Sequence, residues 1–213
     1  MTTPNIRIFN AKWKSHTAGP SPYPDNERVE LFLAGCRIAE EGNPCPNCFN
    51  QETWDRYNYV VEEPVDQTVR HIMACTNNRF ITIVGGEPLD QIDALVELCK
   101  LLKENKFHII VFSHYTLPEI EKMADDNSNY SELLKHIDIL IDGPYKKEFH
   151  IYDEFNNDGL HNAVGSGNQI IWDLQDGRCI GYKSSELDVF AIGLDGVPIF
   201  KFIHSPMPER LGI

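Results

Sequence analysis

The sequence predicts an α/β fold built on a parallel sheet, and two patterns support this prediction. Short apolar runs at residues 80–84, 107–112 and 137–141 have the length of buried strands. Segments with helical character lie between them, at residues 89–102 and 118–123. Because strands that alternate with helices at this spacing form right-handed βαβ units, we expect neighbouring parallel strands with helices packed against them.

Two further elements are expected in the first third of the chain. Residues 28–34 alternate between apolar and other side chains, which predicts a strand, and Gly35 ends it. Residues 65–75 repeat apolar side chains at helical spacing, which predicts a helix. Residues 18–26 are rich in proline and too broken for either structure, so we expect a loop there.

Two hairpins are predicted in the C-terminal third. The apolar runs at residues 170–174 and 179–182 flank an Asp-Gly pair, and so do the runs at 188–193 and 197–203. An Asp-Gly pair between apolar runs is a signal for a β-hairpin. We therefore expect the parallel sheet to be followed by antiparallel strands.

The bulk composition is that of a globular protein. The 213 residues are 42% hydrophobic and 24% charged, so a core can form and wholesale disorder is not expected. We assign residues 1–213 to one domain. Its core covers about residues 28–174, and the hairpins form a C-terminal extension over about residues 175–213.

Charge, hydropathy and cysteine usage limit the partners and the compartment. The formal net charge is −13, without the basic face of a nucleic-acid-binding protein. No apolar run has the length of a membrane span, and the polar residues 1–14 do not form a signal peptide. Three of the six cysteines lie close together, which favours metal binding in a reducing compartment. We expect a cytoplasmic protein that binds neither nucleic acid nor membrane.

The candidate metal ligands are Cys36, Cys45 and Cys48, just after a predicted strand. Ligands bind at the carboxyl ends of strands in α/β sheets, and thiolates are the preferred ligands of iron–sulfur clusters. Three ligands leave one iron of a four-iron cluster open, as three protein ligands do for catalytic zinc. A structural zinc site with His71 or Cys75 as its fourth ligand is the alternative, and the cysteines alone do not decide between the two.

A second candidate site is Gly85-Gly86-Glu87-Pro88, between a predicted strand and a predicted helix. Glycines let the backbone approach a ligand closely, and a helix N-terminus offers free N–H groups to a carboxylate. Glu87 can accept hydrogen bonds from an ammonium group. The segment therefore suits the head group of an amino acid, although a lone Gly-Gly pair would favour a simple strand-to-helix turn.

Together and in this order, the two motifs resemble those of the radical S-adenosylmethionine (SAM) superfamily. A closer resemblance is to the anaerobic ribonucleotide reductase activating proteins. The segments that carry it are Leu33-Ala34-Gly35-Cys36, Cys45-Pro46-Asn47-Cys48-Phe49-Asn50 with Thr53-Trp54, Asp142-Gly143-Pro144, and Gly165-Ser166-Gly167-Asn168-Gln169. The family usually has three residues between its first two cysteines, whereas eight lie between them here. Loop-closure entropy makes this lengthening cost only roughly 1 kcal/mol.

The resemblance implies a fold, cofactors and site residues. The fold is an incomplete (β/α)6-type partial TIM barrel, with SAM at the carboxyl ends of the strands. Cys36, Cys45 and Cys48 match the ligands of a [4Fe-4S] cluster. The positions that match SAM contacts are Asn47, Phe49, Gly85, Gly86 and Glu87, with Ser113 and Asp142 as further candidates. Asp142 is equally suited to capping a turn, and Asn168 and Gln169 match a motif to which no role is assigned.

The implied reaction is the reductive cleavage of SAM at the cluster, which gives methionine and a 5′-deoxyadenosyl radical. In activating enzymes this radical abstracts a hydrogen atom from a backbone glycine of a large glycyl-radical enzyme subunit. The closer resemblance implies an anaerobic ribonucleotide reductase as that partner, and a flavodoxin- or ferredoxin-like protein as the reductant. Because the cofactors carry the chemistry, no acid–base catalyst is assigned beyond the cluster.

Two alternatives stay open. The 7-carboxy-7-deazaguanine synthases are similar in size and also vary the first cysteine spacing, but they tend to carry Asp-Thr where this chain has Phe49-Asn50. Conversion of a pterin substrate without a protein partner would favour them. The other alternative is a non-catalytic metal-binding interaction module, which a colourless protein containing zinc would favour.

Overall fold

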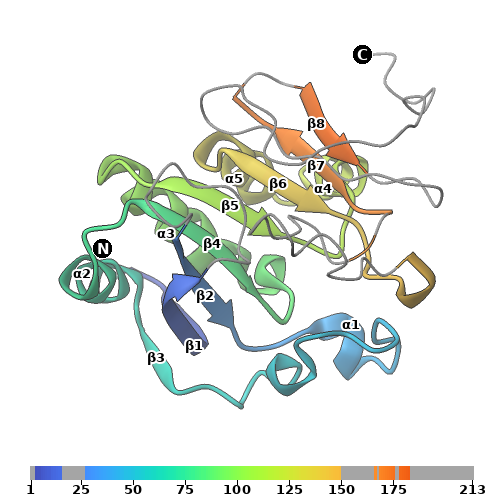
Figure 1. Ribbon diagram of the computed structural model, residues 1–213, viewed down its shortest axis with the longest axis horizontal. Coiled ribbons are helices and arrows are strands. Elements are labelled where there is room, and N and C mark those ends of the chain that lie inside the picture. Colours follow the sequence, from blue (N-terminus) through green and yellow to red (C-terminus); the bar gives the residue numbers. More distant parts are fainter. Residues whose placement is uncertain (1–2, 16–26, 150–165, 167, 176–177, 183–213) are drawn as a thin grey trace, which may run out of the picture.

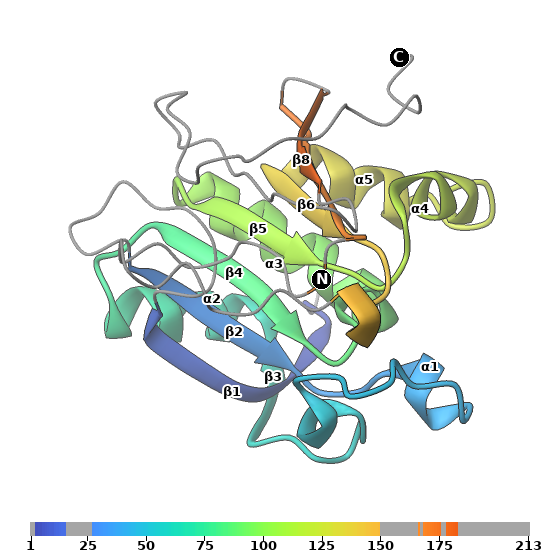
Figure 2. The same cartoon turned by 45° about the vertical axis from the view of Figure 1, so that its right-hand side comes forward.

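The structure is a computed structural model that describes residues 3–15, 27–149, 166, 168–175 and 178–182. Its strands are β1 (Asn5–Ser15), β2 (Arg28–Leu33), β3 (Val61–Pro64), β4 (Phe80–Gly85), β5 (His108–Phe112), β6 (Ile139–Asp142), β7 (Ile170–Asp173) and β8 (Arg178–Tyr182). They form one eight-stranded mixed sheet in the order β3-β1-β2-β4-β5-β6-β7-β8 (Figures 1 and 2).

Five α-helices and three short 3-10 helices accompany the described strands. The α-helices are α1 (Arg37–Glu40), α2 (Val65–Cys75), α3 (Ile92–Glu104), α4 (Leu117–Met123) and α5 (Asn129–His136). The 3-10 helices are η2 (Gln51–Thr53), η3 (Pro88–Gln91) and η4 (Lys147–Phe149). Pro88 occupies the first turn of η3, where its missing N–H is no loss.

The centre of the sheet is parallel. Strand β2 pairs with β4, β4 with β5, and β5 with β6, all in the same direction. Strands β1 and β3 extend one edge in antiparallel pairing, and β7 and β8 extend the other. The α/β class and the order of its strands and helices are therefore confirmed, whereas closure toward a six-unit partial barrel stays a prediction.

The main core lies between the sheet and helices α2, α3 and α5. Alternate residues of the parallel strands point into it, such as Leu31, Ile83 and Val111, and all three are at most 1% exposed. The helices lie together on one face of the sheet (Figures 1 and 2). Each fully buried aliphatic side chain stabilises this arrangement by about 1.5–3 kcal/mol. The core thus fixes the strand ends from which the candidate site is built.

Several elements differ from the sequence prediction. Strands β1 and β3 and helix α5 were not expected. The first predicted hairpin is confirmed, because β7 and β8 pair antiparallel. The second, at residues 188–193 and 197–203, lies outside the described residues, so the domain limits stay a prediction. Within the described part of the chain, no helix is both long enough and apolar enough to cross a bilayer.

Candidate metal centre

The cysteine loop begins at the carboxyl end of β2 and folds back beside its own start. The backbone N–H of Gly35 donates to the Thr53 carbonyl at 2.7 Å, and that of Cys36 donates to the Trp54 carbonyl at 2.9 Å. Cys36 precedes the first residue of α1. Two hydrogen bonds thus close the loop that carries all three candidate cysteines.

The insert between Cys36 and Cys45 contains α1 and is tied to its surroundings. The Glu40 carboxylate pairs with Arg56 of the returning limb, and the Arg37 backbone N–H donates to Asp90 near the start of α3. An open cavity of about 160 Å³ lies beside this insert, and Cys36 is part of its wall. The insert between Cys36 and Cys45 therefore contains an ordered turn of helix that makes its own contacts with the rest of the chain.

The glycine motif packs directly against the start of the cysteine loop. The Gly86 N–H donates to the Leu33 carbonyl at 3.0 Å, and the Glu87 N–H donates to the Gly35 carbonyl at 2.8 Å. A Cβ atom on Gly86 would lie 2.0 Å from the Gly35 oxygen. Gly85 has φ +117°, and a Cβ there would lie 2.4 Å from Leu33 backbone atoms. The two glycines are therefore needed for this packing, and their contact with a ligand stays a prediction.

Backbone N–H groups lie near all three candidate ligands. Those of Ala39 and Tyr145 act to lower the pKa of the Cys36 and Cys45 thiols, against the larger raising effect of burial. Asn50 donates to Cys48 Sγ at 3.4 Å. Backbone N–H donors of this kind hold the thiolate ligands of iron–sulfur clusters and tune their potential. The donor set therefore fits such a cluster.

The electrostatics of the thiols also suit a cationic group. Burial, with smaller contributions from the charges of Glu87, Asp90 and Cys45, raises the pKa of Cys36 to about 12. Burial likewise raises the pKa of Cys45, with Cys48 and Glu87 adding to the effect. Thiols grouped in this way hold their protons until a positively charged metal group displaces them.

The two fourth ligands considered for a zinc site, His71 and Cys75, lie on helix α2 and not in the cysteine loop. His71 Nδ1 lies 3.0 Å from Glu63 Oε1, and Cys75 is exposed at the end of α2. Among the residues that the structure describes, no three His, Cys, Asp or Glu side chains converge on a point where one metal ion would sit. The ligands of a four-iron cluster lie farther apart than those of a single metal ion, because each thiolate binds a different iron atom.

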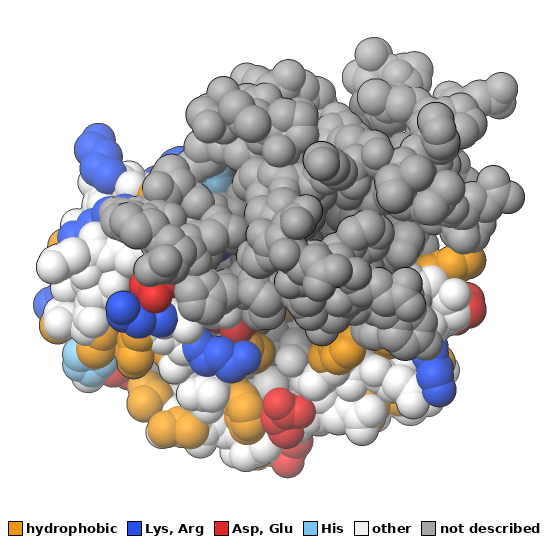
Figure 3. All heavy atoms as spheres, viewed as in Figure 1, with side chains coloured by type: hydrophobic (Ala, Val, Ile, Leu, Met, Phe, Trp, Pro, Cys, Tyr) orange, Lys and Arg blue, Asp and Glu red, His pale blue; other side chains and the backbone are white. Residues whose placement is uncertain are grey.

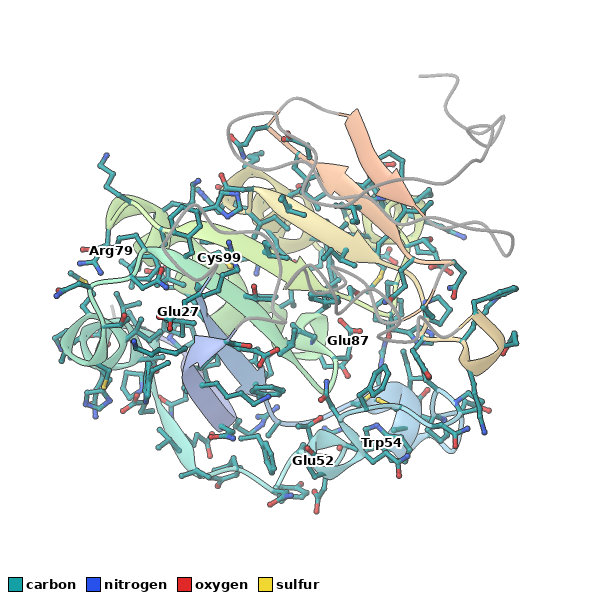
Figure 4. All side chains as sticks on the ribbon, viewed as in Figure 1. Glu27, Glu52, Trp54, Arg79, Glu87 and Cys99 are labelled. Carbon is teal, nitrogen blue, oxygen red and sulfur yellow. The ribbon has the colours of Figure 1, made fainter. Side chains whose placement is uncertain are left out.

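The side chain of Glu87, labelled in Figure 4, is held by three hydrogen bonds at this edge of the sheet. It is 2% exposed. Its Oε1 accepts from the Leu89 N–H and the Ser113 hydroxyl, both at 3.0 Å, and its Oε2 accepts from the His114 N–H at 2.7 Å. Burial raises the pKa of Glu87 to about 7. A carboxylate has about four acceptor sites, so one remains for an ammonium donor.

The structure places Ser113 and Asp142 at the ends of neighbouring parallel strands. Ser113 is buried, and its hydroxyl is directed to Glu87. Asp142 Oδ2 accepts from the Leu117 N–H at 2.6 Å and from Trp172 Nε1 at 2.9 Å, so it holds the start of α4. Its Oδ1 is buried and accepts no hydrogen bond from the described residues, and burial raises the pKa of the carboxyl. Asp142 therefore supports local structure with one oxygen and leaves the other available to a ligand.

Asn47 and Phe49 flank Cys48 and lie at the surface. Asn47 has φ +58°, a left-handed conformation that asparagine tolerates better than most residues. Phe49 is 58% exposed, and its ring meets that of Tyr145 edge-on at 4.8 Å. Phe49 is therefore a surface residue rather than a core residue.

Two residues near the cysteines were not expected from the sequence. His114 Nδ1 lies 3.2 Å from Cys45 Sγ, and Tyr145 contacts both Cys45 and Phe49. His114 follows directly after Ser113 at the end of a parallel strand. Its place just after a predicted strand is a signal for His114 in the sequence, because the carboxyl ends of parallel strands meet at one edge of the sheet.

Comparison with known proteins places this site in a family. Residues 26–172 match the family model described as the 4Fe-4S single cluster domain. The chain is 28% identical over 158 residues to the anaerobic ribonucleoside-triphosphate reductase-activating protein of Enterobacteria phage T4, covering 70% of this chain and 86% of that protein.

Two cellular relatives match over shorter stretches. The pyruvate formate-lyase-activating enzyme of Staphylococcus epidermidis is 29% identical over 119 residues, which is 54% of this chain and 45% of that enzyme. A putative glycyl-radical enzyme activating enzyme of Methanocaldococcus jannaschii is 31% identical over 101 residues, which is 46% of this chain and 38% of that protein. The resemblance to activating proteins is thereby confirmed, and the chain belongs to the 4Fe-4S single cluster domain family.

Proposed function

We propose that this chain is a radical SAM enzyme that activates a glycyl-radical enzyme. Its cluster would be a [4Fe-4S] cluster bound by Cys36, Cys45 and Cys48. The observation that carries the proposal is the set of three thiols, each facing a backbone N–H, directly beside the buried carboxyl group of Glu87. The names of the relatives support the same class of enzyme.

The residues around the cysteines are suited to hold SAM. When bound to the reduced cluster, SAM supplies a 5′-deoxyadenosyl radical. Glu87 would accept the ammonium of its methionine part, because the three donors among the described residues, two N–H groups and the Ser113 hydroxyl, leave one acceptor site of the carboxyl group open. Phe49 would pack against the adenine, and Asp142 Oδ1 would accept a bond from the ribose or methionine.

Other residues of the site orient these groups, contact SAM themselves or leave space for the backbone. Ser113 fixes the orientation of Glu87, and Asn47 would contact SAM next to the last ligand. Gly85 and Gly86 leave the space in which the backbone of β4 approaches the cysteine loop. The proposed fold is a partial barrel whose strand ends shield the reacting atoms from water.

The partner proposed first is an anaerobic ribonucleotide reductase. The phage relative that bears this substrate in its name is matched over 86% of its length, whereas the pyruvate formate-lyase-activating relative is matched over 45%. We also propose a flavodoxin- or ferredoxin-like reductant and a cytoplasmic location. The free thiols Cys36, Cys45 and Cys48 suit a reducing compartment.

The test is anaerobic reconstitution with iron and sulfide, reduction with dithionite, and measurement of 5′-deoxyadenosine. The reduced protein is then mixed with SAM and either an anaerobic ribonucleotide reductase or pyruvate formate-lyase, and the glycyl radical is followed by electron paramagnetic resonance (EPR). A bound four-iron cluster and a radical on the reductase alone would support the full proposal. A glycyl radical on pyruvate formate-lyase alone would mean that the partner is that enzyme and not the reductase. Conversion of a pterin would favour an enzyme that acts on a small molecule. A protein that binds zinc and no iron would reject radical chemistry.

A further inference from the structure

Three polar residues, Ser166, Asn168 and Gln169, hold the chain that follows β6. The Gln169 side-chain amide donates to the Gly143 carbonyl at 3.1 Å, and the Asn168 amide donates to the Pro144 carbonyl at 2.8 Å. The Ser166 hydroxyl accepts from the Lys146 N–H at 3.1 Å. Backbone groups of Gly143, Pro144 and Lys146 are thus bound by three polar side chains.

These three side chains are themselves fixed. Asn168 Oδ1 accepts from the Ser166 hydroxyl at 2.9 Å, and Gln169 Oε1 accepts from the Ser166 N–H at 3.1 Å. Ser166 is fully buried and Gln169 is 6% exposed. Buried amides with both ends bonded are costly to disturb, because each lost partner leaves a desolvated polar group. The arrangement is therefore rigid.

Residues 143–146 in turn contact the cysteine loop through Tyr145. Burial raises the pKa of the Cys45 thiol, and the Tyr145 backbone N–H acts against that rise, so it lies close to the sulfur. The Tyr145 ring meets the Phe49 ring at 4.8 Å, and Phe49 directly follows Cys48. Tyr145 therefore lies beside Cys45 and beside the residue that follows Cys48. Its own neighbours, Pro144 and Lys146, are bound by Asn168 and Ser166.

We propose that Asn168 and Gln169 are positioning residues for the cluster, which they support by holding residues 143–146 so that the Tyr145 N–H faces the Cys45 sulfur. The inference rests on the proposed function, because it takes Cys45 as a cluster ligand. An N–H donor stabilises the more negative, reduced form of a cluster and orients its ligand. Loss of either amide therefore lowers the reduction potential and weakens cluster retention.

The variants Asn168→Asp and Gln169→Glu test this inference. Each keeps the size and the acceptor oxygen but removes the N–H donor to Pro144 or Gly143. The matched control is Gln175→Glu, because the Gln175 amide donates to the Ile137 carbonyl at 3.0 Å at the opposite end of the β6–β7 pair. All variants are reconstituted anaerobically, and folding is checked by circular dichroism.

The readouts are iron retained during dilution in a competing chelator and the midpoint potential from an EPR-monitored titration. We expect cluster affinity about 10–100-fold lower, with a lower potential, in the variants at 168 and 169, and wild-type values in Gln175→Glu. If both test variants retain iron and have the midpoint potential of wild type, the positioning role of Asn168 and Gln169 is wrong, while the proposed function still stands. If one test variant does not fold, the other decides. A wild-type chain that takes up no cluster would overturn the proposed function and this inference together.

Discussion

The sulfur of Cys45 lies 3.2 Å from Nδ1 of His114, and the backbone N–H of the same histidine donates to Glu87 Oε2 at 2.7 Å. One residue at the end of β5 thus contacts both halves of the candidate site. Its imidazole borders a proposed cluster ligand, and its backbone fixes the carboxyl group proposed to bind SAM. A change of side chain at this position therefore acts on the cysteine without removing the donor to Glu87.

Substitution of His114 by alanine is expected to lower the reduction potential of the cluster. In the tautomer that carries its proton on Nδ1, the imidazole donates to the thiolate and stabilises the reduced state, and alanine removes this donor. Asparagine can place an amide N–H near the position of Nδ1, so His114→Asn should restore part of the potential. An EPR-monitored redox titration measures both. Equal potentials in His114→Ala and wild type would reject this role for the imidazole.

Substitution of Cys45 by alanine should abolish cluster binding without unfolding the chain. Cys45 is half-buried in a loop outside the hydrophobic core, so the free energy of unfolding of the metal-free protein should change by less than about 1 kcal/mol. Cys75→Ala, at an exposed thiol on α2, is the control and should keep the full iron content. The measurements are iron analysis and visible absorbance after reconstitution. An iron content in Cys45→Ala equal to that of wild type would show that Cys45 is not a cluster ligand.

Substitution of Gly86 by alanine should strongly destabilise the protein even without metal. The new Cβ would lie 2.0 Å from the Gly35 oxygen, so the ends of β2 and β4 would have to separate, at a cost of about 3 kcal/mol. Gly42→Ala is the comparison, because Gly42 has open space but φ +87°, which costs about 1–2 kcal/mol. Urea unfolding of the metal-free proteins gives both values. A smaller loss in Gly86→Ala than in Gly42→Ala would contradict the packing argument.

Much of the fold was predictable where a pattern is created by burial. Helix α2 and strand β4 were predicted within one residue, because one helical face of α2 is buried and both faces of β4 are covered. The edge strands were missed for the opposite reason. Only two of the eleven residues of β1 are buried, and β3 contains two glutamates, so the stability of both strands comes from pairing with other strands rather than from a local apolar pattern.

The site was predictable to the extent that residue type marks it. The cysteines and the Gly-Gly-Glu segment were expected at neighbouring strand ends, and hydrogen bonds from Gly86 and Glu87 join them there. The support of Cys45 by Tyr145 was not predictable, because a backbone N–H has no signature in the sequence. The contacts of Asn168 and Gln169 depend on the antiparallel pairing of β6 with β7 and needed the structure.

The pH dependence of stability should report the burial of Glu87. Burial raises its pKa from 4.5 to about 7, so the folded protein keeps a proton that the unfolded chain has released. This contribution to stability is complete below pH 4.5 and is lost as the pH rises through about 7. The free energy of unfolding of metal-free wild type, relative to Glu87→Gln, should therefore fall by up to about 3 kcal/mol across this window.

The control for this measurement is Glu132→Gln. Glu132 is exposed, and hydrogen bonds from Lys135 and His136 lower its pKa, so its effect has the opposite sign and lies at lower pH. Urea unfolding between pH 4.5 and 8 gives the three curves. Parallel curves for wild type and Glu87→Gln would mean that this carboxyl group titrates as it does in the unfolded chain. Bound SAM should shift the wild-type curve, because an ammonium beside Glu87 favours the ionised carboxylate and lowers its pKa.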